Sequence, residues 1–262
     1  MRNRSGWSGV SGLALGALVI IWGYAAMGGN LVTLIQPEAL AVVVGGTIAS
    51  LLVSFPSDAL KAAGDGLRDL FLRRPEPLET LVPAFMGYAR KVRRHGLMAI
   101  EQDALAAHDS FLARALNLSV TGLSAEVVRE ALDLEARVCA EREEECAQVL
   151  ESAAGYAPTL GVVGAVLGLM RVMQSFSPES VGVGMASAFV ATLYGVGVAN
   201  LVFLPLATRL RGRARLDALK RDLVIDGVLA LREGASPTVV EERLAGYLRQ
   251  GRQSQTLLAG AA

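Results

Sequence analysis

The chain has 262 residues, and its 25 Lys and Arg residues balance 25 Asp and Glu residues, so its formal net charge at pH 7 is zero. This balance excludes a protein that binds nucleic acid through a net basic surface. Hydrophobic residues make up 52% of the chain and charged residues only 19%. Because an ordinary soluble domain has about 45–50% apolar and about 25% charged residues, the composition predicts a membrane protein.

The first charge-poor stretch covers residues 5–57, where Glu38 is the only Asp, Glu, Lys or Arg residue. Its apolar blocks, Val10–Ala26 and Ala39–Phe55, are each close to the length of a helix that crosses a bilayer, roughly 20 residues. Gly, Asn and Pro residues separate the two blocks, as in a turn. We expect residues 1–56 to form an N-terminal transmembrane hairpin with spans one and two.

The segment 57–151 is polar enough to form a cytoplasmic domain, and its periodicity is helical. Apolar residues recur among Arg and Glu over Val127–Val138, which predicts an amphipathic helix that runs on towards the third span. Arg73–Pro77, with its two prolines, and Gly96 mark breaks between helices. No strand-like alternation stands out, so we expect this domain to be helical.

The second charge-poor stretch covers residues 152–208, where only Arg171 and Glu179 are charged. Its apolar blocks, Ala157–Met173 and Met185–Ala207, predict spans three and four. The sequence therefore predicts an all-α membrane protein with four transmembrane helices in two hairpins.

The positions of Lys and Arg predict the orientation in the membrane. Positive residues lie before the first span, in the central segment and at the start of the tail 209–262, whereas the two short turns carry none. We expect both termini and the central domain to be cytoplasmic. A cleaved signal peptide over residues 1–27 is an alternative, but its apolar run is too long and Ala-Ala-Met-Gly is a poor cleavage site.

Groups that carry enzymatic chemistry are few. Cys139 and Cys146 lie two turns apart on one predicted helix, about 10 Å along its axis, which is beyond disulfide reach. His95 and His108 have no Cys or His neighbours in the sequence that would complete a metal site. We expect no metal, no cofactor and no enzymatic activity.

Spans three and four are rich in small residues. Gly161, Gly164 and Gly168 share one face of span three, and such stripes let helices approach closely in lipid. The hydroxyl groups of Thr159 and Thr192 either line a wet path or bond back to their own helices.

Spans three and four contain two notable prolines, and the predicted spans lack a carboxylate in their middle. Pro158 lies at the start of span three, and Pro205 lies near the cytoplasmic end of span four, where it forms either a hinge or a tolerated kink. No Asp or Glu lies in the middle of a predicted span. If the chain moves ions, a partner has to supply the carboxylate that ion relays use.

Six segments occur in an order and context typical of one family: Met27–Gly29, Val44–Thr47, Ala157–Gly161, Gly168–Leu169, Thr192–Gly195 and Asp226–Pro237. Through them the chain resembles, over roughly residues 10–248, the A subunits of flagellar motor stators, the MotA/PomA family of the wider MotA/TolQ/ExbB group. The resemblance implies a complex in the bacterial inner membrane, in which five A subunits surround two B subunits. Each B subunit supplies one span with an essential Asp and a peptidoglycan-binding domain. Ion passage past this Asp turns the A ring and drives the rotor protein FliG.

The resemblance also implies roles for charged residues of the central segment. Arg93 and Glu101 match the charges that act on the rotor, and the neighbouring Arg90 and Arg94 are candidates to share the role. From the sequence alone these residues form an ordinary solvated helix face.

In the same resemblance, Pro158 and Pro205 match two prolines that couple ion binding to conformation, and Thr159 and Thr192 match pore-facing positions. Ala165 and Ala191 stand where sodium-driven members tend to carry threonines. Fewer hydroxyl oxygens leave fewer ligands for a hard cation such as sodium. We therefore expect proton coupling.

Two other interpretations remain open at this point. ExbB/TolQ-type proteins also use the proton-motive force, but they typically place one span before the cytoplasmic domain and two after it, whereas this chain has two before residue 57. A passive membrane scaffold would use the small residues for packing alone. A single-span partner that carries an Asp distinguishes the stator from the scaffold.

Overall fold

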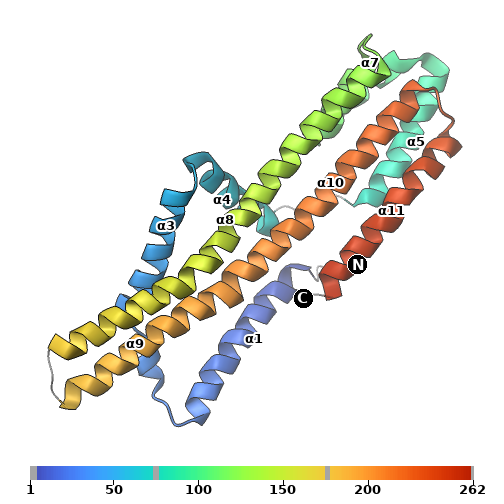
Figure 1. Cartoon of the computed structure of the whole chain (residues 1–262). Coiled ribbons are helices and arrows are strands. Elements are labelled where there is room, and N and C mark those ends of the chain that lie inside the picture. The colour runs from blue at the N-terminus through green and yellow to red at the C-terminus, as the bar shows by residue number, and fades with distance from the viewer. Residues whose placement is uncertain (1–4, 73–76, 175–177, 261–262) are drawn as a thin grey trace. The chain divides into compact units, whose positions relative to one another are not determined.

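The structure, a computed structural model, describes residues 5–72, 77–174 and 178–260 (Figure 1). The α-helices are α1 (Ser5–Ala26), α2 (Pro37–Leu40), α3 (Gly46–Ser54), α4 (Ser57–Leu72), α5 (Leu78–His95), α6 (Glu101–Ala106), α7 (Ser110–Val120), α8 (Ala125–Gln174), α9 (Pro178–Val198), α10 (Leu204–Arg232) and α11 (Pro237–Gly260). Leu31–Leu34 and Leu97–Ile100 are 3₁₀-helices, and Ala41–Gly45 and Ala199–Phe203 are π-helical. No strand occurs among the described residues, which confirms the all-α prediction.

Three segments of the described chain are long and apolar enough to cross a membrane: Leu31–Ser54, Ala125–Gln174 and Gly184–Arg232. The apolar stretch Ser11–Ala26 is shorter, although α1 as a whole has 22 residues, about 33 Å of helix. A multi-pass membrane protein is therefore confirmed, and the count of four spans stays a prediction.

The chain divides into two units that each combine segments distant in sequence. Unit 1 contains the described residues up to Leu72 together with Glu144–Arg211, and unit 2 contains those of Arg73–Glu143 and Gly212–Ala261. The long helices α8 and α10 each contribute to both units. The predicted break at residues 73–77 falls largely outside the described residues. The turn between spans three and four is shorter than predicted, because α9 begins at Pro178, before the block that starts at Met185.

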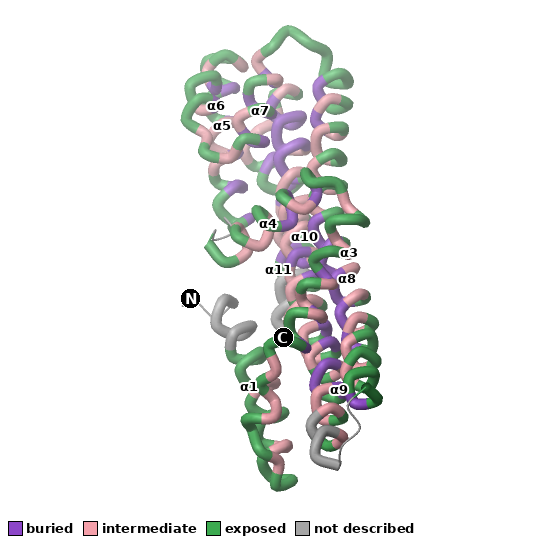
Figure 2. The backbone as a smooth tube through the Cα atoms, turned by 90° about the vertical axis from the view of Figure 1, so that its left-hand side faces the viewer, coloured by how far each residue is buried: buried purple, intermediate pink, exposed green. Residues whose placement is uncertain are grey.

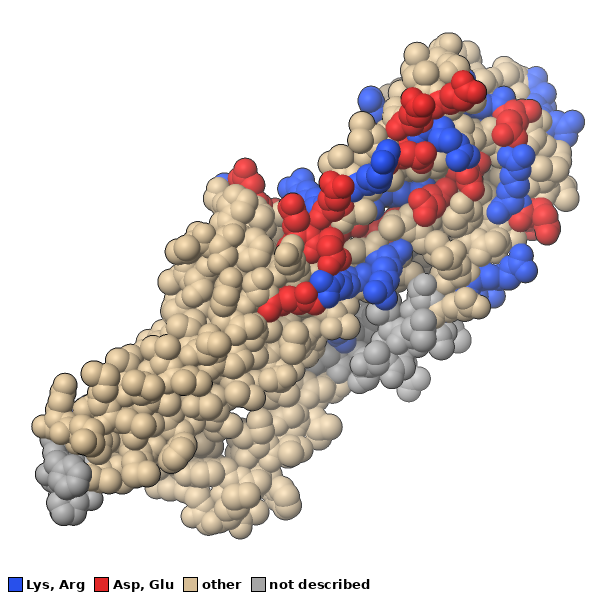
Figure 3. All heavy atoms as spheres, viewed as in Figure 1, with Lys and Arg blue, Asp and Glu red and all other residues tan. Residues whose placement is uncertain are grey.

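Unit 1 exposes apolar side chains and buries small ones. On the face shown in Figure 3, the surface over α3 and the adjoining parts of α8 and α9 is almost free of charged residues. Figure 2 shows α1 as mostly exposed, with some intermediate stretches and no buried one in its described part. Leu18 and Trp22 are among its exposed side chains. Two small clusters lie inside the unit: one contains Val43, Ala154, Ala157 and Ala199, and the other contains Ala62, Ala63, Cys146, Ala147, Val149, Leu150, Ala207 and Leu210.

Unit 2 has a core of large apolar side chains, and α5 packs along α11. Phe85, Leu116, Leu132 and Leu223 are completely buried in this core. A Cβ atom added at Gly227 would lie 2.6 Å from the Phe85 ring, so the absence of a side chain there makes room for the ring. This is the packing expected of a domain that folds in water.

The C-terminal segment is more helical than its composition predicts. Helix α10 continues to Arg232, and α11 runs from Pro237 to Gly260. The Ser-, Gln- and Ala-rich composition of residues 253–262 predicts a disordered end, whereas the helix includes this segment up to Gly260.

Candidate ion pathway and rotor-facing surface

The small residues of span three form a close contact between α8 and α9. A Cβ atom added at Gly161 would lie 2.9 Å from the Ala191 carbonyl oxygen, and one at Gly164 would lie 2.9 Å from the Ala191 Cβ. At Gly168 it would lie 3.2 Å from the Ala188 amide nitrogen. The stripe predicted from the sequence is therefore a packing surface that admits no larger residue without movement of the helices.

A second close contact joins α9 to the proline of α8. A Cβ atom added at Gly195 would lie 2.5 Å from the Ala157 carbonyl oxygen and 3.1 Å from the Pro158 Cα. Both neighbours are backbone atoms, which cannot move aside as a flexible side chain does. Gly195 thus lets α9 rest directly on α8 at Pro158.

Pro158 lies deep inside a helix, because α8 continues without interruption from Ala125 to Gln174. A proline in a helix interior removes one backbone hydrogen bond and costs about 3 kcal/mol or more. This position is therefore weaker than the rest of α8, as a point of bending requires.

Pro205 follows an irregular turn. The π-helical turn Ala199–Phe203 ends two residues before it, and the proline ring would collide with the Leu201 carbonyl in a regular α-helix. Single π-helical turns occur frequently at functional sites. The two prolines assigned by resemblance thus lie at different kinds of helix defect.

The four candidate pathway positions do not form one surface within a single chain. Thr159 is exposed, and its Oγ1 donates a hydrogen bond to the Tyr156 carbonyl at 2.7 Å. Thr192 is half-buried against Gly161, Ala165 is half-buried, and Ala191 is buried between α8 and α9.

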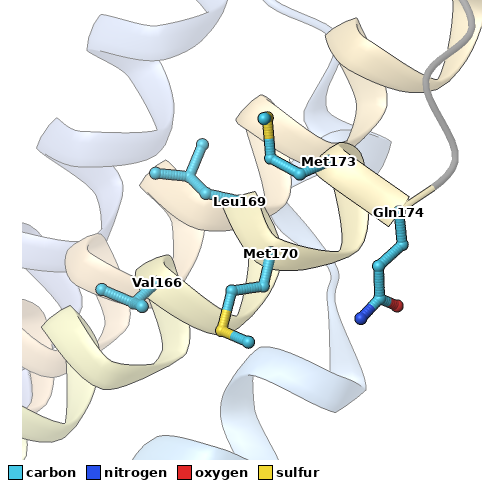
Figure 4. A pocket seen from close by; sticks show the side chains of 5 residues that line it. All are labelled: Val166, Leu169, Met170, Met173 and Gln174. Carbon is cyan, nitrogen blue, oxygen red and sulfur yellow. The ribbon is translucent and has the colours of Figure 1, made fainter.

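Beyond Thr159, α8 has an exposed apolar face. Val166, Leu169, Met170, Met173 and Gln174 line a shallow hollow of about 390 Å³ at the end of α8 (Figure 4). Val166 and Met173 follow Thr159 at intervals of seven residues, two helical turns each, so all three share one face. Such a face suits contact with another apolar helix.

Glu38 and Arg171, two of the few charges of the apolar hairpins, form an ion pair. The Arg171 Nη1 lies 3.3 Å from the Glu38 Oε2, and both side chains are exposed. Pro37 and Glu38 occupy the first turn of α2, where proline fits and a carboxylate meets the positive end of the helix. The pair joins α2 to α8, which sequence analysis missed because 133 residues separate the partners.

An arginine joins α10 to α8 near the prolines. The guanidinium of Arg211 donates hydrogen bonds to Glu144 at 2.7 and 2.8 Å and to Glu151 at 2.8 Å. Glu151 lies two turns before Pro158, and Arg211 lies six residues after Pro205. These bonds hold the two helices together on the side of the prolines away from the apolar spans.

The predicted rotor-facing charges lie around one corner of unit 2. Arg90, Arg93 and Arg94 occupy the end of α5, and Glu101 begins α6. Gly96, with φ of +79°, makes the turn between them. All four charged residues are exposed, and in the described part of the chain none of them forms an ion pair.

Neighbouring residues hold this corner in shape. The Lys91 Nζ donates to both carboxylate oxygens of Asp103 at 2.7 and 2.8 Å, which connects α5 to α6. Lys91 and Asp103 thus satisfy each other, whereas Arg93 and Glu101 remain available to a partner.

Two ion pairs of unit 2 join α10 to distant segments. Lys220 contacts Asp109 at 2.7 Å, and Arg221 contacts Glu143. Burial would raise the pKa of Asp109, but hydrogen bonds from Lys220 and the Leu112 amide hold it below its usual value. Burial raises the pKa of Glu143 above its usual value in spite of Arg221.

Sequence profiles identify both parts of the chain. The profile of the MotA/TolQ/ExbB proton channel family matches residues 103–222, and that of the motility protein A N-terminal region matches residues 10–90. Motility protein A of Bacillus subtilis (strain 168) is 32% identical over 239 residues, which cover 90% of this chain and 88% of that protein.

Two solved structures have the same fold. The structure of C. jejuni MotAB matches with a TM-score of 0.86 and 26% identity over 92% of this chain and 95% of the other. The flagellar MotAB stator complex from Bacillus subtilis matches with a TM-score of 0.84 and 31% identity over 94% and 98%.

The fold and the candidate site define a multi-pass helical membrane protein of the ion-channel class. The chain belongs to the MotA/TolQ/ExbB proton channel family, within its motility protein A branch. The resemblance predicted from the sequence is thereby confirmed.

Proposed function

We propose that this chain is the ion-conducting A subunit of a flagellar motor stator, which couples proton flow through a complex with a B subunit to torque on the rotor. One observation carries this proposal: α8 and α9 pack through glycines around Pro158, without an Asp or Glu in mid-span. The similarity to motility protein A and to MotAB stator complexes supports it.

The B subunit completes the ion path in this proposal. Its single span brings the essential Asp, and the exposed apolar face of α8 that begins at Thr159 suits contact with such a span. Thr159 and Thr192 provide hydroxyl groups on α8 and α9. Because Ala165 and Ala191 lack hydroxyls, the proposed ion is the proton.

Pro158 and Pro205 couple ion passage to conformation. Each proline lies where its helix is weaker or irregular, so a change of charge beside α8 and α9 alters the helices most easily there.

Torque reaches the rotor through the exposed corner of unit 2. Arg93 and Glu101, with Arg90 and Arg94 beside them, present exposed charges of both signs to FliG. Such charges give direction and specificity to a transient contact more than affinity.

The proposed assembly has five copies of this chain around two B subunits in the bacterial inner membrane. Residues 1–56 and 152–208 form the two transmembrane hairpins, and α1 presents its apolar side chains to lipid. Residues 57–151, the tail 209–262 and both termini lie in the cytoplasm, as the positions of Lys and Arg predict.

A clean deletion in the native host tests this function. We expect cells that assemble normal filaments but do not rotate them, and rotation that returns with the wild-type chain. Missing filaments would indicate a role in assembly. Normal swimming with a defect of the outer membrane would favour an ExbB/TolQ-type energiser.

The coupling ion is tested by changing one gradient at a time. We expect the rotation speed to follow the proton-motive force at constant external sodium. Rotation that follows sodium at fixed proton-motive force would contradict proton coupling.

A further inference from the structure

The connection between α1 and α2 is irregular backbone within an otherwise apolar hairpin. Its polar groups are partly satisfied within the connection: the Asn30 Oδ1 accepts from the Val32 amide at 3.0 Å, and the Tyr24 hydroxyl lies 2.8 Å from the Thr33 Oγ1. The Gln36 side chain donates to the Thr33 carbonyl at 3.2 Å. These bonds give the irregular connection a defined conformation.

A residue of α9 supplies two further bonds. The Tyr194 hydroxyl donates to the Leu34 carbonyl oxygen and accepts a hydrogen bond from the Gln36 amide at 3.1 Å. A phenol has one donor hydrogen and an oxygen that accepts, so one hydroxyl fills both roles at once. Gln36 is the N-cap of α2, and its side chain makes no capping bond, so Tyr194 holds the connection where α2 begins.

The same tyrosine lies beside the contact between α9 and Pro158. Gly195, the next residue, rests on the backbone of Ala157 and Pro158. The Tyr194 side chain also packs against the small cluster that contains Val43 and Ala157. One side chain of α9 therefore bonds to the connection before α2 and packs against a cluster to which α8 contributes Ala157.

We infer that Tyr194 is a positioning residue of the proton pathway: its hydroxyl ties the connection between α1 and α2 to α9 and thereby holds Gly195 against Pro158. The role in the pathway rests on the proposed function, whereas the tie itself does not. When α9 moves relative to α8 at Pro158, the first hairpin has to follow it or the two hydrogen bonds break.

The structure offers matched controls for Tyr194→Phe. Tyr24→Phe removes a hydroxyl bond that stays within the first hairpin, and Tyr156→Phe removes the 2.9 Å bond between α8 and Ser54 of α3. Each control loses a tyrosine hydroxyl in the same unit, but neither loses a bond between α9 and the connection.

Hydrogen exchange of the purified complex with its B subunit tests the tie. We expect Tyr194→Phe to speed amide exchange in residues 34–40 by about 5- to 30-fold, the range for a loss of one or two hydrogen bonds. Tyr156→Phe should leave this segment unchanged. Unchanged exchange in Tyr194→Phe would overturn the inference, whatever the chain does in the cell.

Single-motor rotation in the deletion host tests the consequence. At equal membrane level and equal numbers of bound stator units, we expect Tyr194→Phe to reduce the speed per unit severalfold at low load, with both controls near wild type. Equal losses in all three variants would contradict a specific role. A Tyr194→Phe chain that fails to accumulate while the controls do would show a folding role and overturn the positioning role.

The two proposals fail in different ways. If the wild-type chain supports no rotation in a motor that needs a stator, the proposed function is wrong, and hydrogen exchange still decides whether the tie exists. If the wild-type chain rotates the motor and Tyr194→Phe rotates it equally well, only the role of Tyr194 is wrong.

Discussion

Units 1 and 2 differ in the size of the side chains that they bury. Unit 2 buries large side chains such as Phe85 and Leu223, whereas the buried residues of unit 1 are mainly alanines, with glycines at its closest helix contacts. In water, large apolar groups gain most from burial. Lipid removes that gain, so close contact between helix backbones has to provide the stability instead. The difference predicts that unit 1 is damaged mainly by added side chains, and unit 2 mainly by side chains that are removed.

The largest expected effect on stability is in the core of unit 2. Phe85→Ala should lower the free energy of unfolding by about 3–5 kcal/mol, because it removes a fully buried ring and leaves a cavity. The measurement is the thermal unfolding midpoint of the purified complex that carries Phe85→Ala. The control is the complex that carries Leu18→Ala, a change of an exposed residue. Equal midpoints for the two variants would contradict the comparison of the units.

Among single Gly→Ala changes in unit 1, Gly195→Ala should reduce rotation most. The added Cβ atom meets the Ala157 carbonyl oxygen, and forced overpacking costs about 1–3 kcal/mol. Gly197→Ala is the matched control, because a Cβ atom there meets nothing within 4 Å. We expect the first variant to lose most of its rotation and the second to retain it, as a swimming assay at equal membrane level would show.

The pair of Asp109 and Lys220 should make unit 2 sensitive to acid. The pKa of Asp109 is lowered on folding, so its contribution is complete at pH values above the usual carboxyl pKa and is lost as the pH falls through the folded-state value. Asp109→Asn keeps the capping oxygen but removes the charge, and should cost about 1 kcal/mol near pH 7. The thermal unfolding midpoints of the wild-type chain and of Asp109→Asn should converge as the pH falls from 7 to 3. A constant difference between them would exclude the ion pair as the cause of the sensitivity to acid.

The smallest expected change in stability has a large functional effect. Arg93→Ala and Glu101→Ala alter exposed residues and should change the free energy of unfolding by less than about 0.5 kcal/mol. Both variants should slow rotation. Reversal of the charges at Arg93 and Glu101, combined with reversal of the charges that they contact in the rotor, should restore rotation. Arg249→Ala, another exposed arginine of unit 2, serves as the control and should leave rotation unchanged.

Much of this architecture could be predicted from the sequence because it depends on local patterns. Charge-poor stretches mark spans, helical periodicity marks faces, and the glycines at 161, 164 and 168 share a face whatever they pack against. That Ala191 and Ala188 lie opposite them did not follow, because periodicity identifies a buried face but not its partner. The four-span count, the topology and the roles of Arg93, Glu101, Pro158 and Pro205 stay predictions.

Contacts between distant residues were missed for the same reason. Lys220 and Asp109 are 111 positions apart, and Tyr194 and Leu34 are 160 apart. Each of these residues has an ordinary local context, a charged helix face or an aromatic residue in an apolar span. Only the fold brings the partners together, so the spacing of residues in the sequence does not predict these contacts.

The contact between Gly164 and Ala191 has a consequence for anyone who wants to redesign the coupling ion. Ala191 is 1% exposed, and its methyl group already faces the bare backbone of α8 at Gly164, so a threonine there adds bulk at a close contact of the helix pair. Ala165 is half-buried and offers more room. If the two positions select the ion as proposed, a sodium-selective variant would begin at Ala165, whereas a threonine at Ala191 would require a wider helix pair.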